Sequence, residues 1–204
     1  MIGIIDYGAG NLLSVKNALD KLGFSSKIVI EPSALMRTEK AILPGVGAFG
    51  PCRRYLDESA LVPWIREFIS LGRPFLGICV GLQLLMDESQ ERLGADCNPR
   101  GMGLIPGTVK RFPEGLKVPQ IGWNHVRVVQ SSPLFRELPE TGFYCYFVHS
   151  YYVQLKNDSH LLCRTEYGVE YCSGIQKGSL YGLQFHPEKS GWVGLSILKN
   201  FGEM

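Results

Sequence analysis

The 204-residue sequence lacks the features that mark several common protein classes. No apolar stretch approaches the roughly 20 residues of a membrane-spanning helix, and the N-terminal MIGIIDYGAGN has no charged leader typical of a signal peptide. The basic residues are scattered, their longest run is Arg53–Arg54, and the net charge is only +2. Nucleic-acid binding needs a clustered basic surface, so we expect neither a nucleic acid nor a membrane as partner.

Cysteine is present but forms no recognisable framework. No two of the six cysteines have C-x-x-C spacing, and none has a histidine at zinc-ligand spacing, so no metal site is predicted. A disulfide scaffold is not expected in a chain of this length without a secretory leader. We therefore expect a reducing compartment, the cytoplasm, with five idle thiols and one exception, Cys79. The six are Cys52, Cys79, Cys97, Cys145, Cys163 and Cys172.

The distribution of apolar residues predicts one α/β domain over residues 1–204. In the first half, apolar runs alternate with helical patterns, and repeated β-α-β with continuous apolar strands predicts a parallel sheet with helices on both faces. In the second half, short strands follow one another closely. The expected fold is a flavodoxin-like, mostly parallel sheet flanked by helices, with an antiparallel extension in the C-terminal half. Strands are expected at 2–7, 26–30, 40–45, 74–78, 126–129, 143–155, 161–167, 173–176 and 180–185, and helices at 12–22, 61–72, from 82 to 86 onward and at 191–201.

The stretch FLGICVGLQLL places Cys79 between two glycines where an apolar strand ends and a helical pattern begins. This is the layout of a nucleophile elbow, with cysteine in place of serine. The positive end of the helix would favour the thiolate, and the Val80 amide would point where an oxyanion forms. A buried cysteine beside incidental glycines would give the same pattern, so this motif alone leaves both interpretations open.

A histidine and a carboxylate follow another predicted strand. His186 ends the run LYGLQF, and Pro187 favours an extended path beyond it. Alternate residues of an extended chain face the same way, so Glu188 would lie beside His186 and could hold its tautomer. Each residue alone is ordinary in a turn. Combined with the elbow, they predict a triad of Cys79, His186 and Glu188.

Two glycine-rich segments follow other predicted strands. PGVGAFG, residues 44–50, could expose backbone amides toward the thiol as a second oxyanion donor, and a plain glycine turn is the alternative. YGAGN, residues 7–11, begins like a dinucleotide-binding fingerprint. Leu13 stands where its third glycine is needed, so that interpretation is rejected.

In this order, PGVG, GICVGLQ and FHPEKS resemble the class I, triad-type glutamine amidotransferases over essentially the whole chain. The resemblance implies that the Cys79 thiolate attacks the side-chain amide of glutamine. His186 would protonate the departing ammonia, Glu188 would orient His186, and water would hydrolyse a glutamyl thioester, with no cofactor. It further implies an oxyanion hole formed by Val46, Gly47 and Val80, and a glutamine site formed by Gly45, Gln83, Ser150 and Tyr151.

Further segments resemble a narrower group within that family. IIDYGAGN, PQIGWN, YFVHSYY and the terminal HPEKS are similar to the glutaminase subunits of imidazole glycerol phosphate synthase. This implies a heterodimer with a (β/α)8-barrel cyclase, which receives ammonia through a tunnel and forms imidazole glycerol phosphate in histidine biosynthesis. On this pattern Asn11, Trp123 and Lys189 would lie toward the partner. Core packing is the alternative for Trp123, and a plain surface position is the alternative for the other two.

Other functions share parts of this pattern. Glutaminases of vitamin B6 synthesis or of surface-sugar amidination would carry the same triad, and only segments such as QIGWN and FVHSYY would distinguish them. A stand-alone thiol hydrolase of γ-glutamyl peptides would be fully active without a partner. A non-catalytic module would lack Cys79, His186 or Glu188, and all three are present. Free ammonia would become ammonium and diffuse away, which favours a docked acceptor.

Overall fold

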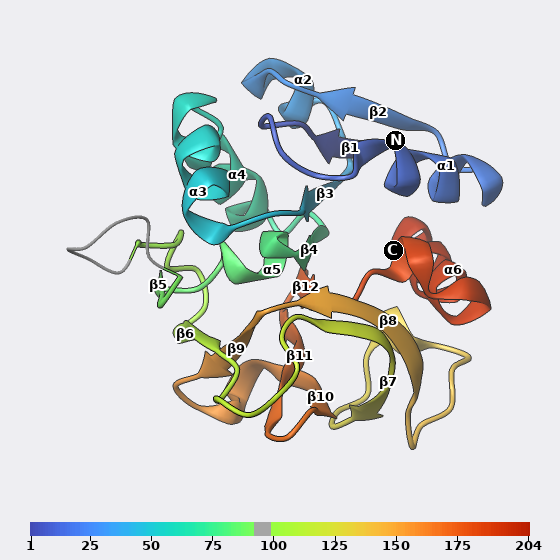
Figure 1. The fold of residues 1–204 in the computed structure, drawn as a ribbon. Helices are drawn as coiled ribbons and strands as arrows, with labels where there is room; N and C mark the ends of the chain where they lie inside the picture. Colours follow the sequence, from blue (N-terminus) through green and yellow to red (C-terminus); the bar gives the residue numbers. More distant parts are fainter. Residues whose placement is uncertain (92–98) are drawn as a thin grey trace.

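The computed structural model describes residues 1–91 and 99–204 and is built around a parallel sheet (Figure 1). The strand order β2-β1-β3-β4-β12 is the flavodoxin-like arrangement, in which ligands bind at the carboxyl ends of the strands. The predicted parallel sheet with an antiparallel extension is therefore confirmed. The parallel strands are β1 (Ile2–Ile5), β2 (Ser26–Val29), β3 (Lys40–Gly45), β4 (Phe75–Cys79) and β12 (Leu180–Leu183).

Helices cover both faces of this sheet. α1 and α6 pack together on one side, and α2 packs with α4 on the other, where α3 also lies (Figure 1). α2 and α3 were not predicted, because α2 is a single short turn and α3 carries glycine and proline near its start. The bounds are α1 (Leu12–Lys21), α2 (Pro32–Met36), α3 (Phe49–Glu58), α4 (Val62–Ser70) and α6 (Gly191–Glu203).

Helix α1 illustrates how the sequence pattern becomes structure. Its buried residues Val15, Ala18 and Leu19 recur every three to four positions and so form one apolar face against the sheet. Its first turn is capped by Asn11, whose side-chain oxygen accepts a hydrogen bond from the Ser14 amide at 3.3 Å. The cap and the apolar face together fix where α1 begins after β1 and how it lies against the sheet.

The helix predicted from Leu82 onward is shorter than expected and starts earlier. α5 spans only Val80–Gln83. Beyond it, the carbonyl of Leu84 accepts from the Met102 amide at 2.7 Å, and that of Met86 accepts from the Gly103 amide at 2.9 Å. These carbonyls would belong to helical hydrogen bonds if α5 continued. The run after Gln83 is apolar because it is buried, not because it is helical.

The C-terminal half extends the sheet with antiparallel strands. β11 pairs with β12, and β10, β7 and β8 follow in that order, while β9, β6 and β5 branch from β11. Short 3-10 turns η1 (Pro133–Phe135), η2 (Asp158–His160) and η3 (Pro187–Lys189) connect the elements. The strands are β5 (Glu88–Ser89), β6 (Gly107–Arg111), β7 (Gln120–Val128), β8 (Phe143–His149), β9 (Tyr151–Leu155), β10 (Leu161–Glu166) and β11 (Glu170–Lys177).

Two strand predictions in this half need correction. The segment 143–155 is two strands broken at Ser150, because β8 pairs with β7 whereas β9 pairs with β6 and β11. The strand expected at 126–129 extends from Gln120 to Val128. Its residues before 126 were not predicted, because this partly exposed stretch contains a glycine, which is depleted in strands. β6 was not predicted.

The remaining expectations concern thiols and membranes. Cys97 lies outside the described residues, and the other five cysteines are buried free thiols. Within the described ranges, no helix is long and apolar enough to cross a bilayer.

Candidate active site

Cys79 occupies a strained turn at the carboxyl end of β4. Its φ is +56° and its ψ is −109°, a conformation that non-glycine residues rarely adopt and that concentrates at functional sites. The glycines two residues before and after Cys79 permit the turn, because neighbouring backbone atoms occupy the space that a side chain there would need. A Cβ on Gly81 would lie 1.9 Å from the Leu43 carbonyl oxygen, and one on Gly77 would lie 2.7 Å from the Gly81 carbonyl. The predicted elbow geometry is therefore present.

His186 lies at the same edge of the sheet because β12 is the parallel neighbour of β4. Its Nδ1 is 2.7 Å from Glu188 Oε1, and both side chains are almost completely buried. The predicted contact between the two residues is thus observed, but the predicted extended path is wrong. Pro187 to Lys189 form the 3-10 turn η3, which folds Glu188 back onto the imidazole.

The electrostatic surroundings favour a charged imidazole at His186. Burial disfavours the charged form, but hydrogen bonding to Cys79 and to Glu188 outweighs it and raises the pKa of His186 to about 10. His186 Nδ1 faces Glu188, so Nε2 is the nitrogen on the Cys79 side, from which a proton could pass to a bound reactant. The site is therefore suited to hold an imidazolium beside the sulfur of Cys79.

The glycine segment after β3 completes the same edge. Gly45 pairs in register with Cys79, and a Cβ on Gly45 would lie 2.7 Å from the Gly81 amide nitrogen. Gly47 has a φ of +104°, and a Cβ added there would meet nothing within 4 Å. The carbonyl of Val46 accepts a hydrogen bond from the Cys52 thiol at 3.5 Å. Val46 and Gly47 thus form a sparsely packed loop directly beside the elbow.

These segments enclose a cavity of about 220 Å³. This is the liquid volume of about seven water molecules, so the cavity suits a ligand of amino-acid size. All predicted oxyanion and triad residues except Glu188 line it, as do Gln83, Ser150 and Tyr151; Gly45 and Glu188 support it from behind. Its lining residues are Val46, Gly47, Cys79, Val80, Gln83, Glu91, Pro119, Val148, His149, Ser150, Tyr151 and His186.

Glu91 is a lining residue that sequence reasoning missed. Its Oε2 accepts a hydrogen bond from the Phe49 amide at 2.7 Å, and burial raises the pKa of its carboxyl above the usual value. A carboxylate in the cavity wall would suit an ammonium group. Glu91 belongs to no motif and only the fold brings it to Cys79, so the sequence carried no signal for it.

His149 fixes the break between β8 and β9 that brings Ser150 and Tyr151 to the cavity. Its Nδ1 is 2.8 Å from the Tyr151 carbonyl oxygen, so Nδ1 carries the proton and donates it. Its Nε2 lies 3.3 Å from the Tyr171 hydroxyl. Burial, assisted by the charge of His186, lowers the pKa of His149 to about 4. His149 is therefore a neutral structural residue of this wall.

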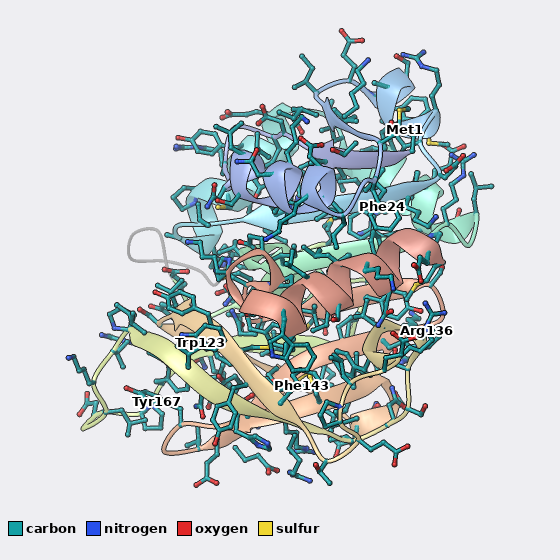
Figure 2. All side chains as sticks on the ribbon, turned by 90° about the vertical axis from the view of Figure 1, so that its right-hand side faces the viewer. Met1, Phe24, Trp123, Arg136, Phe143 and Tyr167 are labelled. Atoms are coloured by element: carbon teal, nitrogen blue, oxygen red, sulfur yellow. The ribbon has the colours of Figure 1, made fainter. Side chains whose placement is uncertain are left out.

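The predicted partner-facing residues lie around η3 on one side of the molecule. Trp123 is 58% exposed, and its ring edge is 3.7 Å from where a Cβ on Gly191 would stand (Figure 2). Core packing of Trp123 is thus excluded. Lys189 is exposed, and Asn11 is half-buried at its capping position. Trp192, 64% exposed at the start of α6, is a further aromatic near this face that the sequence analysis did not select.

Comparison with known proteins identifies the chain. The family model for class I glutamine amidotransferases matches residues 3–203. The chain belongs to the class I glutamine amidotransferase family. It is similar to imidazole glycerol phosphate synthase subunit HisH of Moorella thermoacetica, at 49% identity over 100% of this chain and 94% of the relative. The same subunit of Methanothermobacter thermautotrophicus is 46% identical over 100% of this chain and 98% of the relative.

Solved structures agree with this membership at the level of the fold. The match to the PurLQS structure from Thermotoga maritima covers 99% of this chain and 95% of that chain. Its TM-score is 0.75 and the sequence identity is 20%. A further structure described as a glutamine amidotransferase gives a TM-score of 0.73 at 20% identity, covering 98% of each chain. The mixed α/β sheet with flanking helices is therefore the family's fold.

Proposed function

We propose that this chain is the glutaminase subunit of an imidazole glycerol phosphate synthase and hydrolyses glutamine with Cys79 as nucleophile. The observation that carries the proposal is the convergence, in one cavity of about 220 Å³, of the strained Cys79 and the buried His186 that Glu188 holds at 2.7 Å. The names of the full-length relatives, which include the word subunit, support the pathway and the need for a partner.

The chemistry follows from these positions. The Cys79 thiolate attacks the side-chain carbonyl carbon of glutamine, and the resulting oxyanion is stabilised by the Val80 amide and by an amide of the loop at Val46 and Gly47. His186, charged near neutral pH, gives its proton to the departing nitrogen, which leaves as ammonia. A water then attacks the thioester, His186 takes a proton from it, and glutamate leaves as Cys79 regains its initial state.

The remaining lining residues would hold the substrate. Glu91 places a carboxylate where the α-ammonium of glutamine can pair with it, and Ser150 and Tyr151 contribute a further part of the cavity wall. Gln83 also lines the cavity, one helical turn beyond Cys79. Gly45 serves by permitting close packing of the loop against the elbow rather than by direct contact.

The ammonia would pass to a (β/α)8-barrel cyclase bound over the face that carries Trp123, Lys189 and Asn11. An aromatic residue exposed as fully as Trp123 is typical of interface centres. The Trp123→Ala variant should fold with unfolding free energy within about 0.5 kcal/mol of the parent protein, since its ring is largely in solvent. Its affinity for the cyclase, measured by titration calorimetry, should fall at least tenfold.

The deciding experiment measures glutamate release by the parent protein and by Cys79→Ala, each alone and with the cyclase and its nucleotide ligand. We expect low activity alone, strong stimulation in the complex, and none in the variant, while the cyclase paired with Cys79→Ala still uses added ammonium. Glutaminase activity that survives Cys79→Ala would reject the triad. Equal activity with and without the cyclase would instead indicate a stand-alone hydrolase.

A further inference from the structure

A second polar side chain, besides the imidazole of His186, contacts the Cys79 sulfur. Gln184 follows β12, two residues before His186, and is completely buried. Its Nε2 lies 3.6 Å from Cys79 Sγ, within hydrogen-bond reach for the large sulfur atom, and its Oε1 accepts from Gln83 Nε2 at 3.1 Å. The backbone amide of Gln184 donates to the Ser173 carbonyl at 2.9 Å, which holds the residue in place. Gln184 thus has a buried side-chain amide that is held in place and contacts the Cys79 sulfur.

The direction of these hydrogen bonds is set by a backbone carbonyl. Gln83 Nε2 lies 3.0 Å from the Tyr151 carbonyl oxygen, which can only accept, so the nitrogen of the Gln83 amide must face it. The second hydrogen of that nitrogen then meets Gln184, whose oxygen must face Gln83. The nitrogen of Gln184 is therefore turned toward Cys79. A chain of defined polarity runs from Tyr151 through both glutamines to the sulfur.

We propose that Gln184 is a catalytic residue that donates an N–H hydrogen bond to the Cys79 sulfur, stabilising the thiolate and orienting it, and that Gln83 positions Gln184 for this task. The proposal rests on the proposed role of Cys79 as nucleophile. A donor favours the charged acceptor, so it acts on the thiolate far more than on the thiol. Because both hydrogens of the Gln83 amide are used within the protein, only its carbonyl oxygen remains for the substrate, where it can accept from the carboxamide of glutamine.

Other titratable groups also face Cys79 and set the background for this effect. They come from separate elements: His186 after β12, Tyr7 after β1, Cys52 in α3, and Glu91 after β5. All of them are unchanged by a substitution at Gln184. A shift in the ionisation of Cys79 on such a substitution therefore reports the amide itself.

The test is the pH dependence of Cys79 alkylation by iodoacetamide, followed by mass spectrometry of the peptide that contains Cys79. This readout needs neither glutamine nor the cyclase. In Gln184→Met, which keeps the side-chain length but has no donor, the midpoint should rise by about one pH unit, and alkylation well below the parent's midpoint should slow about tenfold. Glutamine turnover by the complex should fall at least tenfold in kcat.

Two further variants separate this role from a merely structural one. Gln176→Met removes a glutamine amide from β11, away from Cys79, and should leave the alkylation profile as in the parent protein. Gln83→Met frees the Gln184 amide to rotate and should shift the midpoint in the same direction. The double variant should show no larger shift than Gln184→Met alone, because both changes remove the same hydrogen bond. Thermal unfolding of each variant checks that it is folded.

An unchanged alkylation midpoint in a folded Gln184→Met protein would overturn the proposal, as would shifts of Gln83→Met and Gln184→Met that simply add. Failure of the proposed function looks different. In that case Cys79→Ala retains glutaminase activity, whereas the alkylation profiles still report whether Gln184 donates to Cys79.

Discussion

Replacing His149 by asparagine should make the protein more resistant to acid. The imidazole is buried among the rings of Phe112, Phe147 and Tyr171, and burial lowers its pKa from 6.5 to about 4. Between these two pH values the unfolded chain binds a proton at His149 that the folded protein does not. The free energy of unfolding therefore falls as pH falls through this window.

The size of the effect follows from the two pKa values. With a folded pKa of about 4, the destabilisation due to His149 is negligible at pH 7, about 2 kcal/mol at pH 5 and about 3 kcal/mol at pH 4. His149→Asn removes this proton uptake, while its side-chain nitrogen can still donate to the Tyr151 carbonyl. The variant loses ring packing at every pH, so the informative quantity is the change with pH and not the absolute stability.

The assay is urea unfolding at pH 7, 5 and 4, followed by circular dichroism. The stability difference between the parent protein and His149→Asn should move by about 3 kcal/mol in favour of the variant from pH 7 to pH 4. His125→Asn, at an exposed histidine on the neighbouring strand, is the matched control and should keep the parent's pH dependence. A stability difference for His149→Asn that stays constant with pH would refute the reasoning.

Three other substitutions test the elbow and the substrate site. Gly81→Ala would place a methyl group 1.9 Å from the Leu43 carbonyl oxygen, so we expect a loss of about 3 kcal/mol in unfolding free energy by urea titration. Gly47→Ala, which meets no atom but has a φ of +104°, should cost only about 1–2 kcal/mol, and equal losses would contradict the packing argument. Glu91→Gln keeps an acceptor for the Phe49 amide but loses the charge, so steady-state kinetics should show KM for glutamine raised about tenfold with kcat little changed. An unchanged KM would remove Glu91 from the substrate site.

Local chemistry made much of the site predictable. The order of strand, glycine, cysteine, glycine and helix can be read from residues 75–85, because a sharp turn restricts its own neighbours. His186 and Glu188 were found for the same reason, since they are two residues apart. The error at Pro187 was equally local, because proline permits both an extended path and the 3-10 turn that is observed.

Contacts between distant segments were out of reach. α5 ends at Gln83 because carbonyls beyond it bond to amides at 102 and 103, and an apolar run has the same composition whether it is a helix or a buried turn. The break at Ser150 depends on which strands pair with each half of the ribbon. Glu91 enters the cavity only because its carboxylate reaches the start of α3.

The parallel sheet, the elbow at Cys79 and the contact between His186 and Glu188 could be predicted from the sequence, because these depend on periodicity, chain stiffness and side-chain chemistry along short segments. Three features could be found only in the folded molecule: which carboxylate faces the cavity, that Trp123 is exposed, and how the amides of Gln83 and Gln184 are oriented. The last of these depends on the Tyr151 carbonyl, which lies far from Gln83 and Gln184 along the chain. A hydrogen bond has a direction, and that direction is fixed only when folding brings donor and acceptor together.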